Sequence, residues 1–320
     1  MDLADWRSKI EWIPGRFGYG DGLLDLGKTN EDVMVLCCDL AESTRVHLFA
    51  KEFPHRFIEC GVAEQNMAQI AVGLALEGRI PFISSYAVFS PGRNWDQIRI
   101  GVCYNDANVK LAGAHAGLNV GEDGATHQAL EDVAIMRVLP NVRVEVPCDY
   151  WEARKTTVAS AEVNGPVYFR FGRGKGPVVS TEKTPFEFGK AEVFRDGSDV
   201  AILACGPLVY EALVAADELE RKGVSARVIN NHSVKPLDAE TIGKAARDCG
   251  CVVTVEDHQI TGGMGGAVAE FLAKTYPVAQ EFVGMPDSFG ESGAPSELYA
   301  KWGLTSAAIS AAAEKAIKRK

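Results

Sequence analysis

Short apolar segments that favour β-strands alternate with segments of helical periodicity along this chain, and this alternation limits the fold more than any other feature. In the first half, strands are expected over residues 33–38, 56–60, 80–84, 109–112, 142–146 and 167–171. Helices are expected between them, over residues 62–76, 94–104, 128–139 and 149–163. Strands that alternate with helices favour a parallel sheet covered by helices on its faces. The sequence therefore predicts an α/β protein with mainly parallel sheets.

A segment rich in glycine, proline, lysine and threonine interrupts this alternation at residues 172–190. It keeps no sustained period, which is typical of a connection between domains. The alternation then resumes, with strands expected over residues 200–205, 226–230, 251–256 and 278–283 and helices over residues 207–222, 239–248, 265–275 and 307–318. We therefore expect two tandem α/β domains, residues 1–178 and 189–320, joined by a linker at residues 179–188.

Composition narrows the classes of function. Apolar residues make up 47% of the chain and charged residues 24%, which is typical of a folded globular protein. The net charge of −10 argues against a nucleic-acid binder, because phosphate contacts require a basic surface. The apolar runs are far shorter than the roughly 20 residues that span a bilayer, and the N-terminus does not resemble a secretory signal. We expect a soluble cytoplasmic protein with no membrane partner.

The chain has eight cysteines, most of them inside apolar runs such as residues 33–38. No two of them form a CxxC pair, and their spacing does not match a metal site. Buried reduced thiols are the interpretation that fits a cytoplasmic protein. We expect no disulfide framework and no metal site in this chain.

Chemically capable side chains gather just beyond the expected strands of the first half. Because the carboxyl ends of parallel strands lie on one edge of a sheet, loops there usually carry the ligand site. His115 lies between small residues, where the backbone can approach a ligand closely. The residues at or just beyond the strand ends are Glu64, Tyr86, Phe89, His115, Asp123 and His127.

Each of these residues also has an ordinary structural explanation. Glu64 could be a first-turn acid that the helix dipole favours. Tyr86 and Phe89 could be core aromatics, and His127 could simply begin a helix. Their coincidence at one edge of the sheet favours a functional site over six separate structural roles.

Two glycine motifs do not indicate a nucleotide or diphosphate site. Residues 20–22 (Gly-Asp-Gly) resemble the start of a magnesium–diphosphate motif, but Asn30 follows too early and the intervening leucine run is helix-like. Residues 262–266 (Gly-Gly-Met-Gly-Gly) lack the spacing and the acidic partner of a dinucleotide loop. We expect the first to lie in a helix and the second to be a flexible loop before a helix, facing another subunit.

Three segments resemble, in order and spacing, the pyrimidine-domain motifs of transketolases: Gly61-Val62-Ala63-Glu64, Ser84-Ser85-Tyr86-Ala87-Val88-Phe89 and Gly121-Glu122-Asp123-Gly124-Ala125-Thr126-His127-Gln128. Arg137-Val138-Leu139-Pro140-Asn141 continues the match. The likeness runs from about Pro14 to the C-terminus and corresponds to the last two of the three domains of a full-length transketolase. It implies a pyrimidine-binding domain followed by a transketolase C-terminal domain, with the diphosphate-binding domain on another chain.

The resemblance implies roles around thiamine diphosphate. Glu64 would contact the pyrimidine ring of the cofactor and share a proton with it, and we expect apolar side chains around its carboxyl group. Tyr86 and Phe89 would pack on that ring, and Asp39 would approach the cofactor across the subunit boundary. Mg²⁺ or Ca²⁺ would be bound by the partner chain.

The resemblance also implies a sugar-binding set. Asp123 and His127 would hold sugar hydroxyls, and the His127 imidazole could transfer a proton near neutral pH. A doubly charged phosphate suits arginine and hydroxyl partners. The positions that match a phosphate-binding role are Arg16, Ser43, His115 and Arg173.

The chain departs from the family pattern at three positions. Gly92 stands where many transketolases place a further aromatic, and Ala63 and Gln65 replace an arginine and a phenylalanine that often flank the catalytic glutamate. These differences put an ordinary pentose-phosphate substrate range in doubt. The second domain brings no recognised catalytic residue, and residues 256–258 (Glu-Asp-His) are expected to line an interface.

The resemblance implies the C-terminal subunit of a split transketolase, a transferase that moves a two-carbon ketol unit from a ketose phosphate to an aldose phosphate. It would be active only with an N-terminal transketolase subunit and would also self-associate, as a heterotetramer. The alternatives are half of a deoxyxylulose-phosphate synthase, a 2-oxoacid dehydrogenase beta-type subunit, or a non-catalytic regulatory paralogue. The identity of the sugars is left open.

Overall fold

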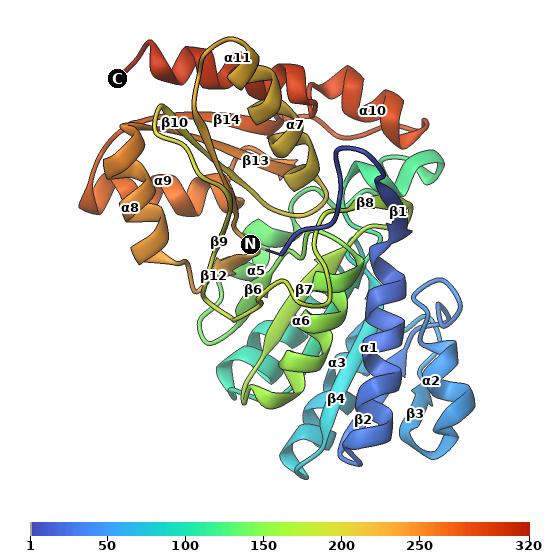
Figure 1. Ribbon diagram of the computed structural model, residues 1–320. Helices are drawn as coiled ribbons and strands as arrows, with labels where there is room; N and C mark the ends of the chain where they lie inside the picture. The colour runs from blue at the N-terminus through green and yellow to red at the C-terminus, as the bar shows by residue number, and fades with distance from the viewer. Residues whose placement is uncertain (1) are drawn as a thin grey trace.

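The computed structural model describes residues 2–320, and its larger sheet has seven strands (Figure 1). All neighbouring strands in this sheet are parallel except the pair β12 and β6. In spatial order the strands are β12 (Ser233–Lys235), β6 (Arg143–Glu145), β7 (Val167–Phe171), β5 (Lys110–Ala114), β4 (Ile80–Tyr86), β2 (Val33–Cys37) and β3 (Phe57–Glu59). The helices between the parallel strands supply the crossover connections that such pairing requires.

Helices cover both faces of this sheet. On one face, α1 (Gly15–Thr29), α2 (His47–Glu52) and α6 (Tyr150–Glu162) enclose a core that includes Tyr19, Phe82 and Phe169. The other face is covered by α3 (Glu64–Leu76), α4 (Trp95–Gln97), a π-helical segment (Ile98–Tyr104) and α5 (Asp132–Arg137). This layering leaves the carboxyl edge of the strands free for loops.

The Gly-Asp-Gly motif at residues 20–22 lies inside α1, so the helix interpretation is confirmed. Its glycines allow close packing of helices. A Cβ added at Gly22 would lie 2.9 Å from the Cβ of Thr157 on α6, and one added at the nearby Gly18 would lie 2.1 Å from the carbonyl oxygen of Tyr150. Gly22 of the motif therefore serves the contact between α1 and α6, whereas Gly20 packs against Arg45.

The second half of the chain builds a five-stranded sheet in the order β14 (Ala279–Met285), β13 (Cys251–Gln259), β10 (Val200–Ala204), β11 (Ala226–Asn230) and β9 (Glu192–Arg195). Only the β11–β9 pair in this sheet is antiparallel. Helices α7 (Leu208–Arg221) and α11 (Ser306–Ile317) pack on one face, and α8 (Ala239–Cys249) and α9 (Met264–Thr275) on the other. Helix α10 (Pro295–Trp302) lies near the first half.

The two halves of the chain are joined by a shared sheet, a shared apolar core and hydrogen bonds. Strand β12 belongs to the second half in sequence but extends the first sheet beside β6. One apolar core runs from Met67 and Val133 in the first half to Met264 and Val268 in the second. Asp257 accepts hydrogen bonds from the backbone N–H of Leu118 at 3.0 Å and from the Tyr299 hydroxyl at 2.9 Å. The expectation that residues 256–258 line an interface therefore holds for the junction between the two halves.

Some elements follow the expectation and others do not. Strands β7 and β11 match the predicted bounds residue for residue. The helix expected over 128–139 is confined to Asp132–Arg137, and the helix expected over 94–104 is largely π-helical. Residues 172–190 contain β8 (Lys175–Val178), which pairs with β1 (Glu11–Pro14). The Gly-rich segment at 262–266 leads into α9, which begins at Met264.

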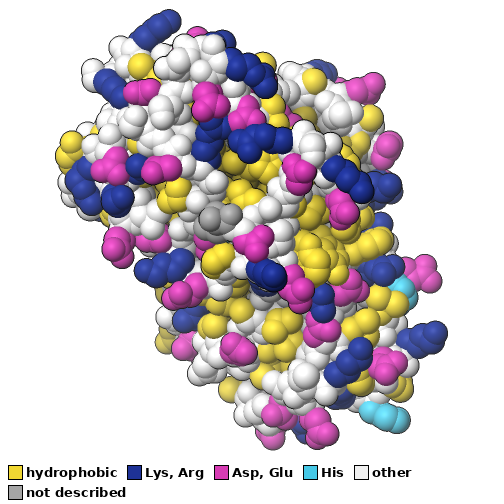
Figure 2. Space-filling model, viewed as in Figure 1, with side chains coloured by type: hydrophobic (Ala, Val, Ile, Leu, Met, Phe, Trp, Pro, Cys, Tyr) yellow, Lys and Arg dark blue, Asp and Glu magenta, His cyan; other side chains and the backbone are white. Residues whose placement is uncertain are grey.

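Three general features of the molecule concern membrane spans, cysteine thiols and surface charge. No helix within residues 2–320 is long and apolar enough to cross a membrane. All eight cysteines are free thiols, and all but Cys60 are buried, as the sequence predicts. Acidic and basic side chains are interspersed over the face of the molecule shown in Figure 2, with apolar side chains gathered near its middle.

Candidate functional site at the carboxyl edge of the first sheet

The register of the central strands brings the predicted residues to one edge. Cys37 on β2 lies opposite Ser84 on β4, and Tyr86 at the end of β4 lies opposite Ala114 at the end of β5. The loop with Asp39, the turn with Tyr86 and Phe89, and the loop that starts at His115 therefore leave the sheet side by side. The parallel arrangement makes this proximity unavoidable, because all three strands end in the same direction.

Four aromatic side chains form the centre of the edge. Tyr86 stacks on His115 with ring centroids 3.9 Å apart and on Phe89 at 5.9 Å. His127 meets both Tyr86 and Phe89 edge-on, at 6.1 and 5.5 Å. Tyr86, Phe89 and His127 are only partly buried, so the cluster is open to solvent on one side. It offers an aromatic surface to a flat ring.

His115 is the most constrained member of this cluster. Its backbone has a φ of +54°, which non-glycine residues rarely adopt, and its side chain is 1% exposed. The Nδ1 atom is buried without a hydrogen-bond partner. Burial first, and then the positive charges of Arg16 and Arg173, lower the pKa of His115 to about 3. His115 is therefore a neutral imidazole that has a free polar atom at the site.

Glu64 begins α3 and is 1% exposed. Its two carboxylate oxygens accept a hydrogen bond from the Ser85 hydroxyl at 3.3 Å and an ion-paired hydrogen bond from Arg93 at 2.7 Å. The guanidinium carbon of Arg93 lies 4.6 Å from the centroid of the Phe89 ring. The apolar enclosure expected around Glu64 is therefore wrong. Arg93 was missed because its carboxylate partner lies 29 residues away.

Asp39 is held at the edge by its backbone. It has a φ of +57°, and its N–H donates to the carboxylate of Glu59 at 2.7 Å. The same Glu59 oxygen accepts from the N–H of Gly61 at 2.9 Å, which links the loop after β2 to the loop before α3. Glu59 was not among the predicted site residues. The Asp39 side chain is exposed, and within residues 2–320 it makes no hydrogen bond or ion pair with the other predicted residues.

Asp123 and Arg173 lie together beside a strongly turned loop. Gly121 and Gly124 have φ values of +78° and +76°, which allow the loop to fold back on itself. Arg173 Nη1 donates to the carbonyl of Val120 at 2.9 Å and lies 3.8 Å from Asp123. Asp123 is about one-third exposed, so it has room for a further partner. The N–H of His127 donates to the carbonyl of Gly124 at 2.9 Å, which ties this loop to the aromatic cluster.

Arg16 and Ser43 meet, but through the backbone of Ser43. Arg16 Nη1 donates to the Ser43 carbonyl at 2.8 Å, which joins the start of α1 to the turn after β2. Burial first, and then the charges of Arg173 and Arg45, lower the pKa of Arg16. Arg45, which the sequence reasoning missed, lies in the same turn. Arg16 and Arg173, two of the predicted phosphate-binding positions, thus place positive charge beside His115, a third.

The departure at residue 92 has a steric reason. A Cβ built on Gly92 would lie 2.1 Å from the carbonyl oxygen of Val88. An aromatic residue would therefore force the backbone of this turn to move. The next residue is Arg93, whose guanidinium lies over the Phe89 ring.

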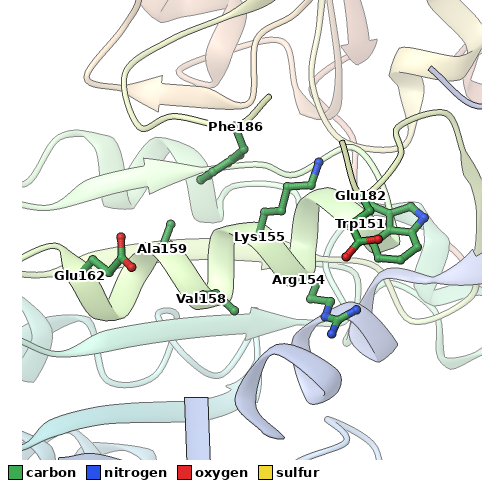
Figure 3. A pocket seen from close by; sticks show the side chains of 8 residues that line it. All are labelled: Trp151, Arg154, Lys155, Val158, Ala159, Glu162, Glu182 and Phe186. Carbon is green, nitrogen blue, oxygen red and sulfur yellow. The ribbon is translucent and has the colours of Figure 1, made fainter. Parts of the chain in front are cut away.

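A pocket of about 340 Å³ lies elsewhere, along the outer face of α6 (Figure 3). Its walls are Trp151, Arg154, Lys155, Val158, Ala159, Glu162, Glu182 and Phe186. Lys155 donates to the carbonyls of Thr181 and Thr184, and Arg154 pairs with Asp25. The two basic groups of this pocket are engaged in structural contacts, and none of the predicted site residues lines it.

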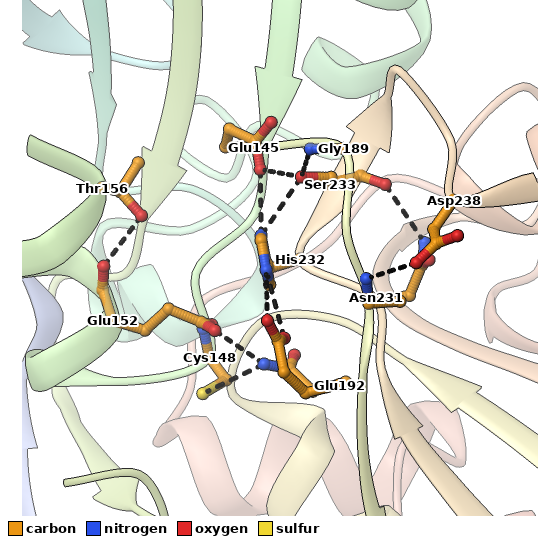
Figure 4. Close-up of polar contacts among 12 residues, drawn as sticks. Glu145, Cys148, Glu152, Thr156, Gly189, Glu192, Asn231, His232, Ser233 and Asp238 are labelled. Atoms are coloured by element: carbon orange, nitrogen blue, oxygen red, sulfur yellow. Dashed lines mark hydrogen bonds and ion pairs between the residues drawn. The ribbon is translucent and has the colours of Figure 1, made fainter. Parts of the chain in front are cut away.

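A second polar cluster is buried between the two halves (Figure 4). His232 lies 3.0 Å from Glu145 and 3.1 Å from Glu192 through its two ring nitrogens. Three of the buried residues, Glu152, Glu192 and His232, present ligand atoms within 4.8 Å of one another, which is a spacing that a metal ion could use. In this structure both nitrogens of His232 contact carboxylates instead. The surrounding carboxylates raise the pKa of His232, although burial opposes them.

Comparison with known proteins agrees with this fold. The family model for the transketolase pyrimidine-binding domain matches residues 13–178, and that for the transketolase C-terminal domain matches residues 189–309. The chain is 40% identical to the 6-deoxy-6-sulfo-D-fructose transketolase subunit SqwH of Clostridium sp. (strain MSTE9), over 97% of this chain and 95% of that protein.

Two further relatives are similar over nearly their whole length. One subunit of the apulose-4-phosphate transketolase of Phocaeicola vulgatus is 38% identical, over 96% of this chain and 98% of that protein. A solved structure described as a split gene transketolase, inactive beta4 tetramer, is 46% identical, covers 96% of this chain and 99% of that chain, and superposes with a TM-score of 0.91. The resemblance seen in the sequence is confirmed, and the chain belongs to the transketolase family as a C-terminal subunit built from its pyrimidine-binding and C-terminal domains.

Proposed function

We propose that this chain is the subunit of a thiamine-diphosphate-dependent transketolase that carries the acid of the pyrimidine site, and that a partner chain with the diphosphate-binding domain completes each active site. The observation that carries the proposal is the buried carboxylate of Glu64 at the start of α3, beside Ser85 and the open aromatic surface of Tyr86 and Phe89. Transketolase-family membership implies dependence on thiamine diphosphate.

The residues present fit such a cofactor. Tyr86 and Phe89 offer stacked rings with a solvent-facing side, as a flat pyrimidine requires. Glu64 is buried and held by Ser85 and Arg93, so its carboxyl group is preorganised to exchange a proton with a ring nitrogen. When bound, thiamine diphosphate supplies the stabilised carbanion that carbon–carbon cleavage needs.

The remaining residues would bind and orient the sugar. Asp123 would accept hydrogen bonds from substrate hydroxyls, and His127 would move a proton near the reacting carbonyl. Arg16 and Arg173 would hold the terminal phosphate, with the Ser43 hydroxyl and neutral His115 adding hydrogen bonds. The transfer would move a two-carbon ketol unit from a ketose phosphate to an aldose phosphate.

The assembly belongs to the same proposal. Asp39, exposed on a fixed backbone, would approach the cofactor from the edge that faces the partner. The partner chain would bind Mg²⁺ or Ca²⁺, and this chain would also contact a second copy of itself. The related proteins named as subunits, and the related structure described as a beta4 tetramer, support a hetero-oligomer that self-associates through this subunit.

The substrate range is part of the proposal. One related subunit is named for 6-deoxy-6-sulfo-D-fructose and another for apulose 4-phosphate. A sugar with a tetrahedral oxyanion at its far end is the chemistry that these names share, and it fits the arginines at the site. The missing aromatic at Gly92 is consistent with a sugar other than the usual pentose phosphates.

The test uses this chain with its partner subunit and compares Glu64→Gln with Glu77→Gln, a control at the exposed far end of α3. Glu64→Gln keeps the shape of the side chain but removes its acid, so ketol transfer is expected to fall by at least about 10²-fold, whereas Glu77→Gln keeps wild-type activity. Near-normal activity of Glu64→Gln would refute the mechanism. Turnover of pyruvate instead of a ketose phosphate would favour the deoxyxylulose-phosphate synthase alternative.

A further inference from the structure

Arg45 has a strained backbone position beside α1. Its φ of +72° is in the left-handed region, which a long side chain rarely adopts. Its Cβ and carbonyl oxygen also crowd α1, because a Cβ at Gly20 would lie 2.8 Å from the Arg45 Cβ. Backbone strain of this kind is concentrated at functional sites.

The Arg45 side chain has no acidic partner. Within residues 2–320 neither Arg45 nor Arg16 forms an ion pair, although many other arginines of the chain do. The Nε atoms of both Arg45 and Arg16 are buried without hydrogen-bond partners. Arg45 instead stacks on Phe17, with its guanidinium carbon 4.2 Å from the ring centroid, and Arg16 lies 5.8 Å from the same ring. Both guanidiniums thus lie near one aromatic ring, and the charge of Arg45 acts on Arg16.

One more group without a partner, the imidazole of His115, lies near Arg16 and Arg173; Arg173 itself pairs with Glu122 at 3.3 Å and Asp123 at 3.8 Å. The Nδ1 atom of buried His115 is without a partner. The charges of Arg16 and Arg173 act on His115, and those of Arg45 and Arg173 act on Arg16. Mutual repulsion among like charges is compensated when an anion with several acceptor oxygens binds between them.

We propose that Arg45 is a third guanidinium of the substrate's anion subsite, acting with Arg16 and Arg173, and that it selects sugars whose terminal group is a doubly charged phosphate. This inference rests on the proposed function, because it assigns the substrate class of that site. A sulfonate has the same tetrahedral shape but a single charge, so the third arginine favours the phosphate. Arg45 binds far from the reacting carbons and therefore acts on KM rather than on kcat.

The test uses the enzyme reconstituted with its partner subunit and the variant Arg45→Gly. Glycine tolerates the left-handed backbone, so this variant keeps the turn folded. KM is measured for a ketose phosphate and for the same ketose without phosphate, together with inhibition by inorganic phosphate and by methanesulfonate. Arg79→Ala, which removes an exposed positive charge paired with Asp32, controls for long-range effects of net charge.

Arg45→Gly is expected to raise KM for the ketose phosphate by about tenfold or more. Its kcat and its KM for the unphosphorylated ketose should stay within about twofold of wild type. The inhibition constant of phosphate should rise more than that of methanesulfonate, and Arg79→Ala should behave as wild type. An unchanged KM for the ketose phosphate, or equal increases for both sugars, would overturn the inference.

Failure of this inference is distinguishable from failure of the proposed function. If Glu64→Gln is inactive while Arg45→Gly leaves KM unchanged, the function stands and the role of Arg45 is wrong. If the reconstituted enzyme transfers no ketol unit, a phosphorus NMR titration of this chain with inorganic phosphate decides the matter. A dissociation constant that is raised about tenfold or more in Arg45→Gly supports the anion subsite, and an unchanged constant overturns it.

Discussion

Replacing His232 with glutamine should destabilise the junction between the two halves, and the loss should depend on pH. His232 is fully buried between Glu145 of β6 and Glu192 of β9, and Glu152 of α6 adds a further carboxylate nearby (Figure 4). Glutamine keeps hydrogen-bonding capacity and similar volume but removes the positive charge. The variant therefore leaves buried carboxylates without their cation.

Two considerations give the expected decrease in the free energy of unfolding. Removing one partner of a buried ion pair typically costs about 3–5 kcal/mol. Burial raises the pKa of Glu145 from 4.5 to about 7, in spite of its hydrogen bond to His232, and the difference between these values is worth about 3 kcal/mol. Proton uptake by Glu145 limits the loss, so we expect His232→Gln to lower the free energy of unfolding by about 3 kcal/mol at pH 7.5.

The sign of the pH dependence follows from the same groups. Glu145 and His232 both have a higher pKa in the folded state than in the unfolded state. Their contribution to stability is therefore fully present at low pH, and it is lost as pH rises through their folded pKa values. His232→Gln removes the contribution of His232, so the difference between wild type and variant should be largest at pH 5 and shrink as the pH rises to 7.5.

Guanidinium denaturation followed by circular dichroism and tryptophan fluorescence measures this difference at pH 5, 6 and 7.5. Lys222→Gln, which breaks the exposed pair with Glu314, serves as the control and should leave the midpoint unchanged. A His232→Gln variant within about 1 kcal/mol of wild type at pH 7.5 would refute the electrostatic reasoning. A loss that is the same at pH 5 would assign the effect to packing.

Three further outcomes are expected. Gly18→Ala should destabilise the chain by about 1–3 kcal/mol, because its Cβ would lie 2.1 Å from a backbone oxygen of α6. Gly73→Ala has nothing within 4 Å of its added Cβ and should stabilise α3 by about 0.5–1 kcal/mol. Thermal unfolding of both variants tests the pair, and equal effects would contradict the packing argument. Glu256→Gln should cost about 1 kcal/mol, because Glu256 accepts from the N–H groups of Met264 at 2.7 Å and Gly265 at 2.9 Å at the start of α9; an unchanged urea midpoint would refute it. Burial lowers the pKa of Lys110 from 10.5 to about 7, so the contribution of Lys110 to stability increases between those pH values. The free energy of unfolding of the wild type relative to Lys110→Met should therefore rise from pH 7 to pH 9.5 in urea titrations. A difference between the two proteins that stays constant with pH would count against that pKa.

Local sequence pattern was sufficient for several strands and for the placement of the candidate residues at one edge of the first sheet. Strand β7 and strand β11 appear at the predicted residues because an apolar run with β-branched or aromatic side chains is a local signal. Short elements such as β12 carry no such signal, since three residues can pair in many ways and only the neighbouring strand β6 selects this one. The helix expected over residues 128–139 was also too long. The loop before Asp132 is held by contacts with distant parts of the chain, which a local pattern does not encode.

The amino-acid pattern alone was enough to predict that Glu64 and the aromatic cluster would lie at one edge, because parallel strands end on the same side whatever the details of packing. The surroundings of these residues depended on the folded structure. Arg93 reaches Glu64 across 29 residues and His232 reaches Glu145 across 87, and no local pattern encodes contacts at such separations. The same holds for Arg45, whose lack of a counter-charge is a property of the folded surroundings. Backbone periodicity is a local property of the chain, whereas the partner of a charged side chain is chosen by the fold.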